Sequence, residues 1–124
     1  MKIGHQGDIL IIQVTDDSVA FSGNLPEITE RNTYVLHHGE ALGNNHELAV
    51  QDGVDVFDQG FLDAAQTVKQ MVVKAQKAFK VFHVNATATT KEDALHKHLE
   101  FPAGTYIVRT QQETMRGVSR RLMD

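Results

Sequence analysis

Hydrophobic and polar positions form short strand-like stretches over most of the chain. These stretches are rich in Val, Ile, Thr, Tyr and Phe, and they are separated by Gly, Asn, Asp or Pro, which is the pattern of β-strands. The expected strands are residues 7–14, 18–23, 32–38, 46–51, 52–57, 81–89 and 104–113. Because they follow one another without alternating helices, we expect an antiparallel sheet.

One segment has a helical period instead. Apolar residues spaced by four, three, four, three and four positions are Phe61, Ala65, Val68, Val72, Ala75 and Phe79. This spacing predicts an amphipathic helix over 61–79. Leu62, Met71, Val73 and Ala78 add apolar surface at the edges of that helix. The helix then either plugs an open end of the sheet or forms a contact between copies of the chain, and the second interpretation predicts a homo-oligomer.

The length of the chain, 124 residues, fits one domain with its own core. The predicted fold is mainly β, with an antiparallel sheet that forms a sandwich or a small barrel. It comprises six to seven strands and one inserted helix at 61–79, in a single domain that covers 1–124.

The composition excludes several classes of site and partner. Without cysteine, the chain has no disulfide and no zinc–thiolate site. Its net charge of -4 argues against nucleic acid or an anionic membrane as the main partner. No apolar run approaches the ~20 residues of a membrane-spanning helix, and the N-terminus lacks the apolar region of a signal peptide. We therefore expect a soluble cytoplasmic protein.

Three patches carry a resemblance to a known family. They are "HQGDIL" (5–10), "HGEALGNNHEL" (38–48) and "LHKHLEFPAGTYIVRTQQE" (95–113). In this order they resemble a family of small, mostly uncharacterised bacterial and phage proteins. Its pattern has Gln-Gly-Asp first, Gly-Glu-x-x-Gly-His-x-His in the middle, and His followed by Leu-Pro-x-Gly-x-Tyr-x-Val-x-x-Gln-x-Glu last. The matching residues are Gln6, Gly7, Asp8, Gly39, Glu40, Gly43, His46, His98, Pro102, Gly104, Tyr106, Val108, Gln111 and Glu113.

The resemblance implies a β-rich fold and a bacterial or phage source, in the cytoplasm or in association with a virion. It implies no established activity. The chain departs from the pattern at Asn44, which replaces the first histidine of the middle patch, and between His98 and Pro102, where the spacing is one residue short. Relative to compact members of the family, the helix at 61–79 would be an insertion.

The middle and last patches hold the candidate chemistry. Glu40 and His46 flank one loop, and His96 and His98 share a face if their segment is extended, since strand side chains alternate. Imidazole and carboxylate groups that converge from different strands can bind a divalent metal ion. We therefore predict that Glu40, His46 and His98, with His96 in a lesser role, hold a divalent metal ion or a small ligand. The alternative is that these side chains bond to backbone groups of their loops.

A second histidine pair lies in the expected strand 32–38. Strict alternation places Thr33, Val35 and His37 on one face of that strand. His38 then lies on the opposite face, so at most one of the two histidines can join a given site.

Three functions are compatible with these features. The first is a small accessory protein that binds a metal ion or a small ligand at a His/Glu pocket. The second is an oligomeric interaction or structural protein without catalysis, whose partner is another protein. The third is a hydrolase, with or without metal, that uses histidine as general acid and base. Metal analysis of the purified protein separates the first function from the second.

Overall fold

The computed structural model describes residues 3–6, 9–38, 45–84 and 98–111. In these residues the chain forms nine strands and one short 3-10 turn, η1 (Asp16–Ser18). The strands are β1 (Ile3–Gln6), β2 (Ile9–Val14), β3 (Thr33–His38), β4 (Asn45–Ala49), β5 (Val54–Phe61), β6 (Val68–Ala75), β7 (Phe79–Val84), β8 (His98–Phe101) and β9 (Gly104–Gln111). The mainly β prediction is confirmed.

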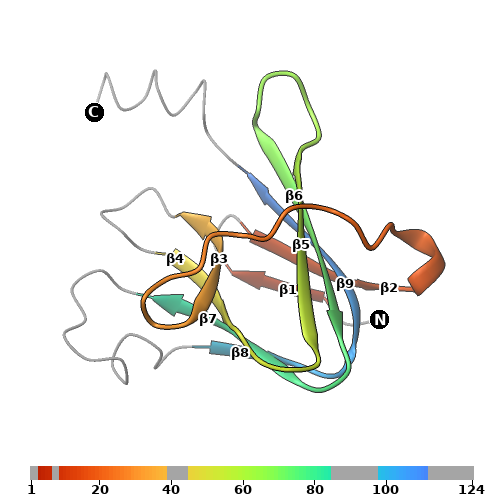
Figure 1. The fold of residues 1–124 in the computed structure, drawn as a ribbon. Coiled ribbons are helices and arrows are strands. Elements are labelled where there is room, and N and C mark those ends of the chain that lie inside the picture. Colours follow the sequence, from red (N-terminus) through yellow and green to blue (C-terminus); the bar gives the residue numbers. More distant parts are fainter. Residues whose placement is uncertain (1–2, 7–8, 39–44, 85–97, 112–124) are drawn as a thin grey trace.

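The strands form two antiparallel sheets that share one core (Figure 1). Sheet A has five strands in the order β1-β2-β9-β6-β5, and sheet B has four in the order β3-β4-β7-β8. The buried apolar cluster draws side chains from both sheets, such as Ile11 and Tyr106 from sheet A and Leu48 and Phe101 from sheet B. The two sheets therefore bury their inner faces against each other, as in a β-sandwich.

The prediction of a helix over 61–79 is wrong. This segment contains the end of β5, a hairpin loop, the whole of β6 and the start of β7. β6 lies between β9 and β5, and its residues Met71 and Val73 face the core while Val72 is buried on the outer face. A strand that is buried on both faces has a continuous apolar run instead of an alternating one. The helical spacing arose because this run was combined with Phe61 of β5, Ala65 of the hairpin loop and Phe79 of β7.

The hairpin loop at 62–67 has its own local stabilisation. Asp63 accepts hydrogen bonds from the backbone N–H groups of Thr67 (2.9 Å) and Val68 (3.1 Å), and also from the Thr67 hydroxyl. Gln66 has φ of 57°, which lies in the left-handed region of backbone conformation. These turn features are difficult to distinguish from a helix start in sequence, because Asp also favours the first turn of a helix.

Strand boundaries differ from the expected ones in three further places. Residues 18–23 form no strand. β1 precedes the first expected strand, and β8 lies between the last two expected strands, 81–89 and 104–113. No helix in the described part of the chain is long and apolar enough to cross a membrane.

The segment 19–32, here called the strap, joins sheet A to sheet B. Phe21 lies against the outer face of sheet A, where its ring contacts that of Phe57. Asn24 then exchanges two backbone hydrogen bonds with Asp58 at the edge of β5. Farther along, Ile28 forms a bridge to Tyr34 at the edge of β3. The strap therefore spans the seam between the edge strands β5 and β3 (Figure 1).

Val73→Lys should unfold the protein and not merely dissociate an oligomer. Val73 is fully buried in the core, so an unpaired ammonium group there should cost at least about 3 kcal/mol of unfolding free energy. Urea unfolding followed by circular dichroism at two protein concentrations measures this loss.

The matched control is Leu62→Lys in the hairpin loop, where the side chain is 52% exposed. This variant should change the unfolding free energy by only about 0.5 kcal/mol. A folded monomeric Val73→Lys variant would contradict the assignment of this residue to the core. The predicted homo-oligomer itself stays a prediction, but Met71 and Val73 are core residues and not a contact surface.

Candidate functional site between the two sheets

A β-bulge in β3 determines which way its histidines point. The register of β3 against β4 shifts between Val35, which pairs with Glu47, and His37, which pairs with His46. The extra residue reverses the alternation that the sequence predicts, because a bulge places two residues opposite one. His37 therefore faces the inside of the sandwich with His46, whereas His38 pairs with Asn45 on the outer face.

Three imidazole rings lie in a row on the inner face of sheet B. The ring centroids of His37 and His46 are 5.6 Å apart, and those of His46 and His83 are 5.0 Å apart. The second pair is stacked, with an interplanar angle of 8°. His37 and His46 are buried, whereas His83 is exposed, so the row runs towards solvent at one end.

The four residues predicted as metal ligands fall into two groups. Glu40 and His96 lie outside the described residues. His46 pairs with His83 on β7, whereas His98 pairs with Phe82. Since consecutive strand residues face opposite sides, His46 and His98 project from opposite faces of sheet B.

The structure therefore does not bring His46 and His98 together, and the four-residue site stays a prediction. His98 is exposed and its ring contacts that of Phe82, at 5.6 Å between centroids. Within the described ranges, no group of three or more His, Asp or Glu side chains is arranged to hold a metal ion.

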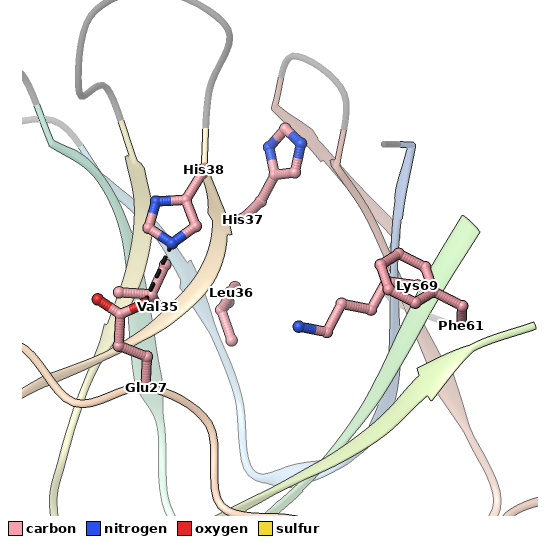
Figure 2. A pocket seen from close by; sticks show the side chains of 7 residues that line it. All are labelled: Glu27, Val35, Leu36, His37, His38, Phe61 and Lys69. Carbon is pink, nitrogen blue, oxygen red and sulfur yellow. Dashed lines mark hydrogen bonds and ion pairs between the residues drawn. The ribbon is translucent and has the colours of Figure 1, made fainter. Parts of the chain in front are cut away.

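A pocket lies where β3 faces β6 across the seam, and we call it the histidine pocket. Its volume is about 110 Å³, and it is lined by Glu27, Val35, Leu36, His37, His38, Phe61 and Lys69. Lys69 comes from the inner face of β6, and its ammonium group is directed towards Leu36 on β3 (Figure 2). The same ammonium lies 3.0 Å from Asp58 Oδ2.

His38 forms hydrogen bonds at the outer rim of the histidine pocket. Its Nε2 lies 3.2 Å from Glu27 Oε1 of the strap, and its Nδ1 lies 3.0 Å from Asn45 Oδ1. The Asn45 amide nitrogen donates to Glu47 Oε2 at 3.1 Å, which leaves its oxygen to accept from His38. Both ring nitrogens of His38 therefore lie within hydrogen-bond distance of an oxygen.

This hydrogen-bond network ends at a buried carboxylate. Glu47 on β4 has no exposed surface, and it accepts from the Arg31 guanidinium at 3.2 Å (Nε) and 2.6 Å (Nη2), in a bidentate arrangement. The Thr33 hydroxyl donates to the same carboxylate at 2.6 Å. With the bond from Asn45, four donors surround the group, which offsets the cost of its burial.

The pKa of Glu47 reflects the competition between burial and these bonds. Burial raises the pKa of the carboxyl group, because the charged form loses its hydration. The hydrogen bonds from Arg31, Thr33 and Asn45 and the charge of Arg31 together outweigh burial, so the pKa is held below the ordinary value of 4.5. The same hydrogen bond to Glu47 raises the pKa of the Arg31 guanidinium.

Sequence reasoning missed Glu27, Glu47 and Lys69. Glu47 offered a signal, since it is a lone charged residue inside the apolar stretch His46–Val50, and such a residue must be paired if it is buried. Lys69 lies between the apolar positions of the helix predicted for 61–79, which does not form. Glu27 lies in a loop and offered no signal in sequence.

Arg31→Ala should destabilise the protein strongly. It leaves the Glu47 carboxylate buried without its cationic partner, which should lower the unfolding free energy by about 3 kcal/mol. Chemical denaturation of the two proteins measures the loss. Arg109→Ala is the control, because Arg109 bonds to Gln70 at an exposed site. This substitution should lower the unfolding free energy by less than about 1 kcal/mol. Equal losses in the two variants would show that the buried pair has no special role.

Glu47 should also contribute to acid sensitivity. Its pKa is lower in the folded chain than in the unfolded chain, so its stabilising contribution is fully present above about pH 4.5. That contribution is lost as the pH falls through the depressed folded pKa. We expect the unfolding free energy of Glu47→Gln to fall less steeply below pH 4.5 than that of the parent protein. Glu30→Gln, at an exposed position of the strap, should retain the parent slope.

Comparison with known proteins gives a family but no activity. No curated protein and no solved structure matches the chain. The family model described as "Domain of unknown function (DUF8820)" matches residues 5–111, which is most of the sequence. This agrees with the resemblance to an uncharacterised family, although the match does not test the individual motif patches. The chain therefore belongs to the DUF8820 family.

Proposed function

We propose that this protein binds a small organic acid in the histidine pocket. The observation that carries the proposal is the position of Lys69, whose ammonium group is directed into the pocket from sheet A towards the histidine strand β3 (Figure 2). An ammonium group has three donors, and Asp58 occupies one of them. Lys69 can therefore bind a ligand carboxylate without breaking its existing ion pair.

The other walls of the pocket favour a ligand with a polar head and a short apolar body. Leu36 and Phe61 supply apolar surface, and His37 adds an imidazole ring to the lining. Glu27 is the one acidic side chain among these lining residues, and it is bonded to His38 at the rim and not directed at Lys69 by any bond. Convergent polar groups on an apolar wall are typical of small-molecule sites.

The size of the pocket limits the ligand. Its volume of about 110 Å³ is below the roughly 300–1,000 Å³ of pockets that hold drug-sized molecules. A carboxylic acid with a short carbon chain fits this space, whereas a nucleotide or a sugar chain does not. The proposal is therefore restricted to small acids.

Titration with acetate and propionate should shift the NMR signals of Lys69, Phe61 and β3, and propionamide should not. Lys69→Met should weaken propionate binding by about tenfold, since a hydrogen bond to a charged partner is lost. The control is Lys74→Met, on the same strand but with its ammonium over the Phe21 ring on the outer face. The control should bind propionate like the parent protein. Equal binding of propionate and propionamide, or equal losses in the two variants, would contradict the proposal.

A further inference from the structure

A second pocket lies along the same seam and shares no lining residue with the histidine pocket. Its volume is about 260 Å³, and we call it the strap pocket. It is lined by Gly23, Asn24 and Leu25 of the strap, by Tyr34 of β3, and by Asp55, Val56 and Phe57 of β5. It is therefore an open pocket that is bordered by the strap and by both edge strands.

The strap wall of this pocket is fixed against β5. Asn24 N–H donates to Asp58 O at 2.8 Å, and Asp58 N–H donates to Asn24 O at 2.7 Å. Gly23 has φ of 147°, and a Cβ atom there would lie 2.5 Å from the Asp58 carbonyl oxygen. Only glycine allows this close approach, so the pocket is a built feature of the fold and not a gap beneath a loose loop.

The edge of β5 presents backbone groups to the strap pocket. Asp58 uses its N–H and C=O to bond Asn24, on the side of β5 that faces away from β6. Backbone groups in a strand point to alternate sides, so those of Val56, two residues earlier, point to the same side. In the described part of the chain, no backbone group pairs with Val56 on that side. The pocket is therefore lined by a residue whose carbonyl and N–H have no backbone partner among the described residues.

The charge of the strap pocket is negative. Asp55 is exposed and has no ion pair or hydrogen bond with any residue that the structure describes. The lysine opposite it in the ladder, Lys74, has its ammonium over the Phe21 ring at 4.5 Å from the centroid. Lys69, on the same strand, is paired with Asp58. A ligand cation would therefore face Asp55 without a competing lysine in the pocket lining.

We propose that the strap pocket binds a small organic cation with an amidine, guanidine or amine head and a flat apolar body. The head donates to the Asp55 carboxylate and to the Val56 carbonyl. The body lies against Tyr34, Phe57 and Leu25, whose side chain is 67% exposed at the pocket. The volume of 260 Å³ accommodates one aromatic ring with its head group.

The peptide edge is too short for a bound strand. Asn24 occupies the edge at Asp58, and Gln51 O accepts from Val54 N–H at 3.3 Å on the other side of Val56. One residue with open backbone groups cannot support the addition of an extended chain, which needs several main-chain bonds. The ligand of this pocket is therefore a small molecule and not a peptide strand.

Benzamidine is the test ligand, with benzamide as its neutral isostere and benzoate as its anionic one. In an NMR titration, benzamidine should shift the backbone signals of Asn24, Asp55, Val56 and Phe57. Benzamide and benzoate should bind about tenfold more weakly or cause no shift. Asp55→Asn keeps the shape of the side chain and should weaken benzamidine binding by about tenfold. Asp52→Asn, in the exposed turn before β5, should leave binding unchanged.

The outcomes separate this proposal from the one for the histidine pocket. Benzamidine shifts should be unaffected by Lys69→Met, because Lys69 lines only the other pocket. The proposal is overturned if benzamidine and benzamide bind equally, if Asp55→Asn binds like the parent protein, or if no benzamidine shift appears at millimolar concentration. None of these results bears on propionate binding.

Discussion

The buried carboxylate of Glu47 and the guanidinium of Arg31 form the interaction on which the arrangement of the strap depends. Glu47 belongs to β4, inside sheet B, whereas Arg31 is near the end of the strap that arrives from sheet A. A carboxylate with no exposed surface must be paired, so its burial requires Arg31 to be in place. The strap in turn supplies Glu27 to the histidine pocket and Gly23, Asn24 and Leu25 to the strap pocket. The ion pair between Arg31 and Glu47 thus supports the walls of both pockets.

The location of both pockets follows from the unpaired edge strands of a β-sandwich. Two stacked sheets leave edge strands whose backbone groups lack partners, and β3 and β5 are such edges here. The strap satisfies part of each edge, at Asp58 of β5 and at Tyr34 and Val35 of β3. It cannot cover the whole seam in one crossing. The uncovered parts of the seam become the two pockets.

The sequence predicted the class of fold because that class depends on local composition. Short stretches rich in β-branched residues, separated by turn residues, gave a mainly β antiparallel domain, and β2, β3, β4 and β9 were each recognised approximately. The failure at β6 has a physical cause. A strand buried on both faces has no period of two, so Met71, Val72 and Val73 could be assigned to a helix stripe as readily as to a strand.

The candidate site was less predictable, because a single residue decides which side chains meet. Without the bulge in β3, His37 would share the outer face with Val35, and His38 would point into the sandwich. The bulge reverses the direction of both side chains. His37 therefore lies beside His46, and His38 lies within hydrogen-bond distance of Glu27 and Asn45. Nothing in the stretch Thr33–His38 marks where the extra residue lies. The histidines were therefore recognisable as candidate chemistry from sequence, whereas their partners depend on strand register, which is set by contacts between distant segments.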